Sequence, residues 1–176
     1  MMYVSKKENK MSKPTIGLFG TCGSSTWRKD FIEEYKSLGI NYYNPQIEQW
    51  DETCAAIEAE HLVNDEIVLF PVTSETYGTG SLGETGFSII QAINSNRSRF
   101  VVIMIDKVLD ESLKDNGLAY KESTRARALV LAHLNKINYE NVYIVSNMQE
   151  LLQVSIKLYQ ISEKLNELKQ FSSLKG

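Results

Sequence analysis

The residue in this chain that is best suited to covalent chemistry is Glu84, which lies in the glycine-rich stretch Thr79-Gly80-Ser81-Leu82-Gly83-Glu84-Thr85-Gly86-Phe87. Apolar runs at 67–72 and 88–93 flank this stretch, so the pattern predicts a strand, a turn and a helix that starts near Glu84. Ser81 and Glu84 have the spacing of a capping box, which satisfies free amides at a helix start. Glycine within a helix costs roughly 1 kcal/mol relative to alanine, which favours instead a ligand that approaches the backbone closely. Glu84 is therefore either a helix cap or the carboxylate of a small-molecule site.

A second glycine-rich stretch, Gly20-Thr21-Cys22-Gly23-Ser24-Ser25, follows the apolar run 15–19 and leads into a helical pattern. Free amides at a helix start attract anions, and small residues allow a phosphate or a sugar to come close. Arg28 offers a bidentate contact to such an anion. The alternative is a tight turn in which Ser24 or Ser25 caps the following helix. Both interpretations stay open on the sequence alone.

Cys22 and Arg28 are separated by five residues, which is the spacing of cysteine-dependent phosphatases. In those enzymes a thiolate attacks phosphorus inside an anion-binding loop. However, Lys29 stands where they usually have serine or threonine, and the chain has no Asp-Pro acid of the small phosphatases with this type of fold. A phosphatase is therefore a minor alternative.

A third polar group is Asn44-Pro45-Gln46 with the nearby Trp50. An amide can read the donor and acceptor edge of a base, and tryptophan can stack on it. The alternative is a polar turn over an apolar anchor. Elsewhere, Asp65 and Glu66 are expected to be solvated, and Arg125 and Arg127 fall at a predicted helix start, where the dipole disfavours cations.

Length and composition set the limits for these sites. The 176 residues fit one domain, expected over 14–170 after a mobile, lysine-rich arm at 1–13. The net charge of −3 argues against nucleic acid or anionic lipid as a partner, and the apolar runs are too short to span a membrane. Cys22 and Cys54 are expected to be reduced thiols in the cytoplasm. No cluster has the spacing of metal ligands, and no cofactor is expected.

The chain as a whole alternates between strand and helix patterns. Strands are predicted at 15–19, 40–43, 67–72, 100–105 and 142–145, and helices at 25–38, from Asp51 or Thr53 onwards, at 81–94, at 122–135 and along 151–168. The polar connection 106–121 is long enough to be a lid. Four strands are almost continuously apolar, which is typical of strands buried on both faces.

This alternation predicts a doubly wound, five-stranded parallel sheet with helices on both faces and the flavodoxin-like strand order 2-1-3-4-5. In such sheets, ligands bind beyond the carboxyl ends of the strands. That edge is expected to gather the polar segments 20–28, 44–50, 73–84, 146–148 and the start of the 106–121 connection.

Three of these segments together resemble the nucleoside 2-deoxyribosyltransferase-like family, over roughly residues 15–152. They are Ile16-Gly17-Leu18-Phe19-Gly20-Thr21-Cys22-Gly23-Ser24-Ser25-Thr26-Trp27-Arg28, Tyr43-Asn44-Pro45-Gln46, and Thr76-Tyr77-Gly78 through Gly83-Glu84. The resemblance implies a flavodoxin-like fold, homo-oligomers that share sites between subunits, and attack by Glu84 on the anomeric carbon of a deoxynucleoside. A second base or water then takes the sugar, as in retaining glycosidases.

The resemblance also implies roles for other residues. The Gly20–Ser25 loop would hold the sugar or its 5′ end, Gln46 would lie near the base, and Asn147 matches an amide that the family places in the neighbour's site. Gly80 and Ser81 are further candidates for contact with the substrate, which would be a nucleoside or a nucleotide.

The chain departs from the family pattern at two positions. Leu18 and Phe19 occupy the strand in which the well-known transferases carry a tyrosine that supports the glutamate. Gly78 stands where they carry an aspartate that protonates the leaving base. Tyr77 is the candidate for one of these roles. The alternatives to an N-glycosidic enzyme are a protein that binds nucleotides without turnover and the phosphatase that uses Cys22 and Arg28.

Overall fold

The computed structural model describes residues 13–47, 49, 51–95, 99–169 and 171. Its five strands form one parallel sheet in the order β2-β1-β3-β4-β5, which confirms the predicted fold class. The strands are β1 (Ile16–Leu18), β2 (Tyr42–Tyr43), β3 (Ile67–Val72), β4 (Phe100–Ile105) and β5 (Val142–Val145). Of the predicted arm at 1–13, all but Lys13 lies outside the described residues, as does Trp50.

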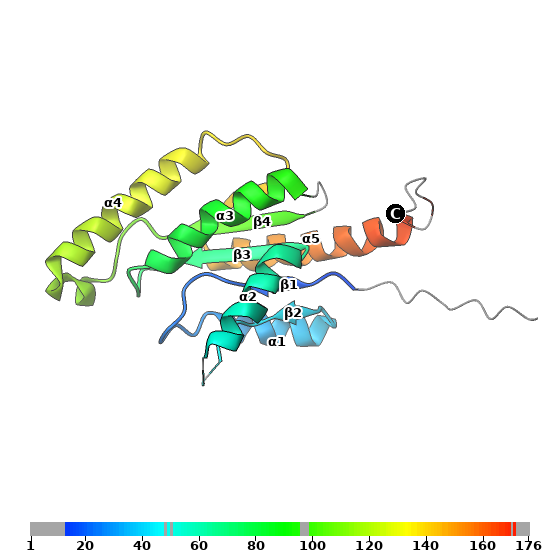
Figure 1. Cartoon of the computed structure of the whole chain (residues 1–176), viewed down its shortest axis with the longest axis horizontal. Coiled ribbons are helices and arrows are strands. Elements are labelled where there is room, and N and C mark those ends of the chain that lie inside the picture. The colour runs from blue at the N-terminus through cyan, green and yellow to red at the C-terminus, as the bar shows by residue number, and fades with distance from the viewer. Residues whose placement is uncertain (1–12, 48, 50, 96–98, 170, 172–176) are drawn as a thin grey trace, which may run out of the picture.

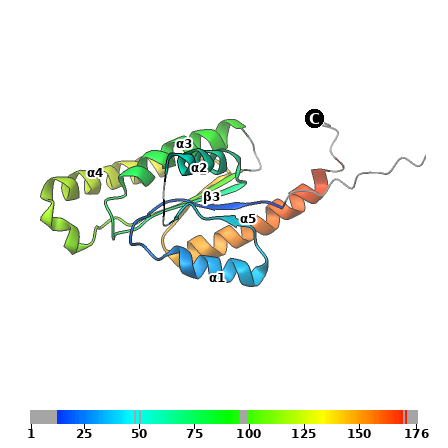
Figure 2. The ribbon, with the colours of Figure 1, turned by 60° about the horizontal axis from the view of Figure 1, so that its bottom comes forward.

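Helices cover both faces of the sheet. They are α1 (Arg28–Leu38), α2 (Glu52–Asn64), α3 (Thr79–Ser95), α4 (Gly117–Leu134) and α5 (Met148–Lys169), with a short 3-10 helix, η1 (Glu111–Asp115), before α4. Helices α2, α3 and α4 lie on one face, and α1 and α5 lie on the other (Figures 1 and 2). Because side chains alternate along a strand, β3 and β4 contribute to both cores and are buried throughout.

The two cores follow from this alternation. Leu18, Leu69 and Val102 are neighbours in the sheet and pack towards α1 and α5, with aromatic side chains of α1. Their neighbours in sequence, such as Phe70 and Ile103, pack towards α3 and α4. The rigid sheet therefore fixes the ends of β1 and β3, where the candidate loops begin.

Several predicted boundaries are wrong. Helix α1 begins at Arg28 rather than Ser25, and its N-cap position is Trp27, so neither Ser24 nor Ser25 caps it. Helix α4 begins at Gly117, because the side chain of Asn116 accepts from the amide of Ala119. The predicted long connection at 106–121 is therefore largely helical.

Candidate functional site

Arg28 holds the loop between β1 and α1 from the inside. Its side chain is buried, with 2% exposed. Nε donates to the carbonyl of Leu18 (2.8 Å) and Nη1 to the carbonyl of Thr21 (2.6 Å). Nη2 faces the carbonyl of Gly20 (3.4 Å) and Sγ of Cys22 (3.3 Å). Burial lowers the pKa of Arg28, while the thiol of Cys22 and the charge of Glu58 raise it.

These contacts bear on the phosphatase alternative. That mechanism needs guanidinium donors aimed at phosphate oxygens, whereas Arg28 directs all three of its nitrogens at groups of its own chain. Cys22 is exposed, and its thiol donates to the carbonyl of Gly20 (3.4 Å). Arg28 therefore acts as an internal support of the loop, and the geometry does not favour phosphate chemistry at Cys22.

The same loop is fastened to β3. The amide of Thr21 donates to the carbonyl of Pro71 (2.8 Å), and the Thr21 hydroxyl oxygen accepts from the amide of Thr73 (2.9 Å). Gly20 has φ +90°, and a Cβ there would lie 2.5 Å from the carbonyl oxygen of Pro71. Glycine is needed at this position because a side chain would collide with the β3 backbone.

The β2–α2 connection closes over this loop. Gln46 donates through Nε2 to the carbonyl of Gly23 (2.9 Å), and its Oε1 lies 3.5 Å from Nη1 of Arg28. Asn44 accepts from the amide of Gln46 (3.1 Å). Together with Ser24 and Ser25, these residues line a cavity of about 540 Å³. The structure thus brings together two of the three segments that carry the family resemblance.

The connection from β3 to α3 is clamped by Arg127. This side chain is fully buried, and it donates to the carbonyls of Val72 (2.9 Å), Thr73 (2.8 Å), Thr76 (2.7 Å) and Asp106 (2.9 Å). Arg127 lies in the third turn of α4 rather than at its start. The expectation of a cation at a helix start is therefore wrong, and Arg127 serves the backbone.

Gly78, where the resemblance implies an aspartate, has no room for a side chain. It has φ +64°, and a Cβ there would lie 2.5 Å from Cγ1 of Val72 and 3.2 Å from Nη2 of Arg127. Both the backbone conformation and the close approach favour glycine. The departure from the family pattern is therefore part of how this connection is built.

Helix α3 presents Glu84 in a way that the sequence did not predict. The helix begins at Thr79, two residues early, so Ser81 lies inside its first turn and the predicted capping box is wrong. The Ser81 carbonyl accepts from the Thr85 hydroxyl (2.6 Å), and both residues are buried. Glu84 is half-buried beside them. Apart from the adjacent residues and the nearby backbone of α3 itself, no described atom lies within 4 Å of a Cβ built at Gly80, Gly83 or Gly86, so packing against other elements does not explain these glycines.

Glu84 shares its surroundings with a second carboxylate, Glu58 of α2. Helix α2 packs against α3, and Glu58 is also half-buried. Burial raises the pKa of Glu84, and the negative charge of Glu58 raises it further. Burial raises the pKa of Glu58, whereas the positive charge of Arg28 lowers it. These shifts favour a protonated Glu84 beside an ionised Glu58.

The sequence analysis missed Glu58, which the burial of α2 in the structure reveals. In α2, the partly buried side chains are Cys54, Glu58, His61 and Leu62, whereas the rest of the helix is exposed. These positions recur at intervals of three and four, as the inner stripe of a surface helix does. A charged residue on that stripe is unusual and indicates a function or a partner.

Two predicted site residues lie elsewhere. The Tyr77 hydroxyl donates to the carbonyl of Leu113 in η1 (3.0 Å), so the phenol points away from the glycine-rich loop. Asn147 follows β5, the sheet edge opposite β2, and its side chain accepts from the amide of Glu150 at the start of α5. None of the contacts found among the described residues joins either one to Glu84.

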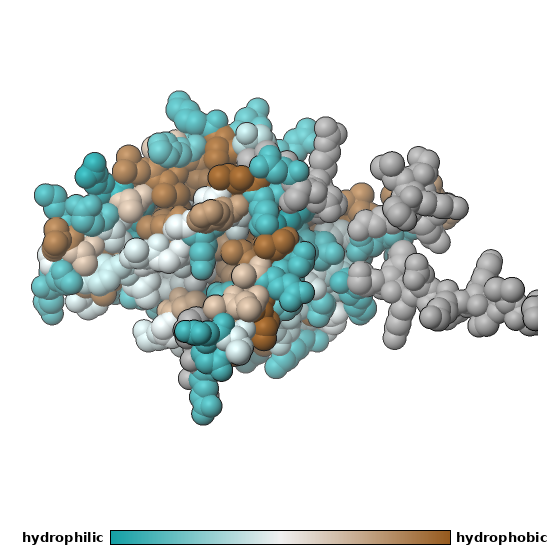
Figure 3. Space-filling view, viewed as in Figure 1, coloured by the Kyte–Doolittle hydropathy of each residue, from teal (hydrophilic) through white to brown (hydrophobic). Residues whose placement is uncertain are grey.

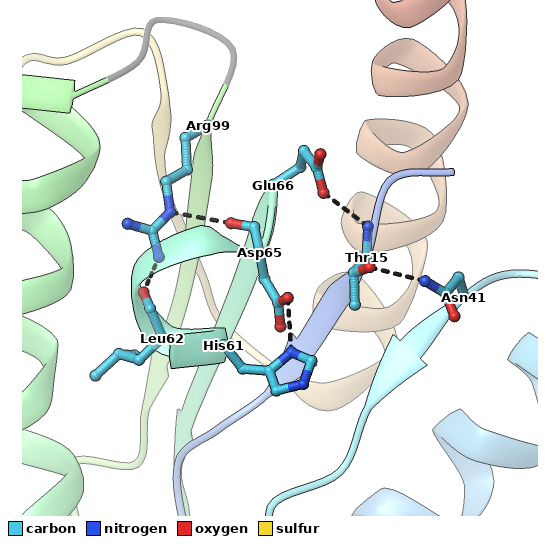
Figure 4. Close-up of polar contacts among 7 residues, drawn as sticks. All are labelled: Thr15, Asn41, His61, Leu62, Asp65, Glu66 and Arg99. Atoms are coloured by element: carbon cyan, nitrogen blue, oxygen red, sulfur yellow. Dashed lines mark hydrogen bonds and ion pairs between the residues drawn. The ribbon is translucent and has the colours of Figure 1, made fainter. Parts of the chain in front are cut away.

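The opposite, amino edge of the sheet holds a buried polar cluster (Figure 4). Asp65 is only 4% exposed, so the expectation that it is solvated is wrong. Its Oδ1 lies 2.9 Å from Nδ1 of His61, and the guanidinium of Arg99 donates to the carbonyls of Asp65 and Leu62. Burial raises the pKa of Asp65 to about 6. Because it lies at the edge remote from the loops, this cluster is structural.

Two further findings concern the described residues alone. No group of three His, Cys, Asp or Glu side chains among them is placed to hold a metal ion. None of the helices in this part of the chain combines the length and the apolar content that a membrane span requires.

The strand order and the loops at the carboxyl edge define a flavodoxin-like α/β protein. Within this class, the model of the family described as nucleoside 2-deoxyribosyltransferase like matches residues 13–106, more than half of the chain. The chain belongs to this family. The match includes the loops at Gly20 and Asn44 as well as Glu58 and Glu84. No curated protein matches the chain.

Proposed function

We propose that this protein cleaves the N-glycosidic bond of deoxynucleosides, with Glu84 as nucleophile and Glu58 as proton carrier. A carboxylate oxygen of Glu84 attacks C1′ while the bond from C1′ to the base nitrogen breaks. The leaving base takes the proton of Glu58, and the sugar stays on Glu84 as an ester. A second base or water then attacks C1′, gives its proton to Glu58 and releases Glu84.

The observation that carries this proposal is the pairing of two half-buried carboxyl groups on neighbouring helices. The pKa of Glu84 is raised by burial and by the charge of Glu58. The reaction needs an ionised Glu84 and a protonated Glu58, whereas the charge of Glu58 raises the pKa of Glu84 and Arg28 lowers the pKa of Glu58. In this proposal the proton therefore passes from Glu84 to Glu58 when the substrate binds. Glu58 thereby offers the proton that the family takes from an aspartate, whose position is filled here by Gly78.

The loops around Arg28 supply the binding surface in this proposal. The small residues of the Gly20–Ser25 loop lie against the sugar, and the amides of Asn44 and Gln46 lie near the base. Arg28 links the two parts, because it lines the 540 Å³ cavity and its charge acts on Glu58. The glycines of α3 leave open space beside Glu84 for a substrate or a second subunit.

The test is release of free base from the common 2′-deoxynucleosides, followed by chromatography with and without an acceptor base. We expect Glu84→Gln to abolish release and Glu58→Gln to slow it at least about a hundredfold, which is the usual effect of losing a general acid. Glu58→Gln removes a charge that raises the pKa of Glu84. In the pH profile of the activity that remains in this variant, the acid limb should therefore move to lower pH. The exposed Glu60→Gln is the matched control on α2.

Two outcomes would overturn this assignment. Full activity in Glu84→Gln would exclude it as the nucleophile. Recovery of the wild-type protein with an unchanged nucleoside or nucleotide, and no cleavage of any substrate, would indicate a binding protein instead.

We also propose that the protein is a homo-oligomer that uses the outer face of α3. Phe87 is 76% exposed and Ile90 59% exposed, and apolar side chains gather over α3 and α4 (Figure 3). Gly83 and Gly86 lie on the same outer face with open space above them. Large and small residues on one surface let a second copy pack on it about a two-fold axis. Phe87→Asp should lower the oligomeric state in light scattering, while Lys164→Asp on α5 should not.

We place the protein in the cytoplasm, as the two cysteines suggest. Cys22 and Cys54 are free thiols in the structure. Unpaired cysteines are typical of reducing compartments.

A further inference from the structure

A second cavity lies at the other end of the carboxyl edge of the sheet. It has a volume of about 660 Å³ and is found where β4 and β5 end, beside the end of α4. None of the described residues lines both this cavity and the one at the Gly20–Ser25 loop. Clefts that hold small molecules have volumes of about 300–1,000 Å³. The structure therefore has room for a ligand that is separate from the proposed substrate.

Aliphatic side chains supply the apolar part of this cavity. Ile105 is the last residue of β4, Val145 is the last residue of β5, and Leu131 lines the cavity from α4. Ile144 and Val108 also line it and are 41% and 72% exposed. Apolar surface that is open to water gains free energy when a ring or a hydrocarbon chain covers it. These side chains therefore favour a ligand with an apolar body.

The negative charge in the cavity is balanced within the protein. Oδ2 of Asp106 accepts a hydrogen bond from the amide of Ser74 (2.8 Å). The guanidinium of the buried Arg127 donates to the backbone carbonyl of Asp106 (2.9 Å). Burial lowers the pKa of Arg127, whereas the charge of Asp106 raises it. Asp106 and Arg127 therefore compensate each other's charge.

The positive charge in the cavity has no such partner. Lys107 is exposed and takes part in none of the ion pairs found among the described residues. Asn135 and Ser146 add an exposed amide and an exposed hydroxyl to the same cavity. An ammonium group attracts carboxylate and phosphate groups, and amides and hydroxyls donate hydrogen bonds to the same oxygens. The polar part of the cavity therefore suits an anion.

We propose that this cavity is a second ligand site, which binds a small organic anion with its charged group at Lys107 and an apolar ring or chain against Ile144 and Leu131. Ser74 also lines the cavity, so the ligand contacts the connection between β3 and α3. None of the residues that hold the anion takes part in the proposed cleavage of nucleosides, so the site can bind its ligand with or without that activity.

The experiment follows the backbone amides of the full chain, labelled with ¹⁵N and deuterium, in TROSY spectra. The probes are phenylacetate, phenyl phosphate and the uncharged phenylacetamide. Both anions should shift the amides of Lys107, Val108 and Ser146, and they should bind about threefold or more tightly than phenylacetamide. The anion that binds more tightly shows whether the site prefers a carboxylate or a phosphate.

Two variants separate the charge from the apolar surface. Lys107→Gln should weaken phenylacetate binding about threefold and leave phenylacetamide unchanged, because only the charge is lost. Ile144→Thr keeps a β-branched residue on β5 and should weaken both probes, since it removes apolar surface. The exposed Lys121→Gln on α4 is the matched control and should change neither.

Several results would overturn the proposal. Shifts in the Gly20–Ser25 loop instead would place the anion in the first cavity, and shifts confined to Phe87 and Ile90 would place the ring on the outer face of α3. Equal binding of phenylacetate and phenylacetamide, or no loss in Lys107→Gln, would show that the site does not select anions. No shift with any probe would show that the cavity does not take such a ligand.

Discussion

Replacing Asp65 by asparagine should stabilise the protein at neutral pH. Asp65 is buried at the amino end of β3, and its Oδ2 has no hydrogen-bond partner among the described residues. Its pKa is about 6 in the folded protein, raised chiefly by burial from an ordinary value of 3.8. Although His61 and Arg99 favour the charged form, they do not offset the burial. Ionised Asp65 is therefore a destabilising charge.

The sign and size of the effect follow from this pKa. Because the folded pKa lies above the unfolded one, Asp65 contributes stability that is fully present below pH 3.8 and is lost as the pH rises through 6. A pKa shift of about two units corresponds to at most about 3 kcal/mol in the free energy of unfolding. Water near His61, whose side chain is 34% exposed, should reduce this value.

The assay is urea unfolding of wild type and Asp65→Asn at several pH values. We expect the variant to be more stable by about 1–3 kcal/mol at pH 7.5, with the difference vanishing near pH 4. Asparagine keeps the shape of the side chain and can still bond His61. The control is Asp51→Asn, because the pKa of the exposed Asp51 is lowered by bonds from Thr53 and Cys54. The contribution of Asp51 to the stability of the protein is therefore lost in acid, and Asp51→Asn should not be more stable than wild type at pH 7.5.

A constant difference between pH 4 and pH 7.5 would refute the reasoning, since it would show that Asp65 does not change its charge state between folded and unfolded chains. A loss of stability in Asp65→Asn at pH 7.5 would also refute it. That result would mean that the interactions with His61 and Arg99 outweigh burial.

Two pairs of substitutions test how the β3–α3 connection is held. Arg127→Met should destabilise the fold by about 3 kcal/mol or more in urea unfolding, because it leaves several buried carbonyls unpaired. The exposed Arg125→Met should change the stability by less than about 0.5 kcal/mol, and equal effects would contradict the clamp. Gly83 lies within α3 and has open space around it. Gly83→Ala should therefore raise the melting temperature, through a gain of about 0.5–1 kcal/mol in the free energy of unfolding. Gly78→Ala should lower it because of its positive φ and its clash with Val72, and a gain there would show that the connection is not constrained as described.

The sheet could be predicted from the sequence because its strands are short, apolar and separated by helical patterns. Ile67–Val72 and Phe100–Ile105 have the predicted bounds, since strands buried on both faces tolerate few polar residues. The errors lie at helix starts. Helix α1 starts late because the residues before it form a loop, in which Arg28 binds the carbonyls of Leu18 and Thr21 and Thr21 bonds to Pro71 and Thr73 at the end of β3. Such tertiary contacts leave no local pattern in the sequence.

The candidate site was predictable only where residue types were unusual. The glycines at 20 and 23 marked a loop, and Gln46 proved to touch it. The roles of Arg28 and Arg127 could not be predicted, because an arginine that supports carbonyls and one that binds a ligand look alike in sequence. Glu58 was missed for a related reason. A glutamate on a surface helix is ordinary until its neighbours are known.

The role proposed for Glu58 is linked to the way in which the connection between β3 and α3 is built around Gly78. The contacts of Arg127 with Val72, Thr73 and Thr76 draw the chain tightly around Gly78, so a carboxylate cannot stand there. In the proposed mechanism, the proton for the base that leaves C1′ must then come from another element. Helix α2 packs against α3 and directs Glu58 inwards, where Arg28 holds its pKa below the value that burial alone would give. If Glu58 has taken over this role, restoring a carboxylate at position 78 should not rescue Glu58→Gln, because the side chain would displace the connection that positions Glu84.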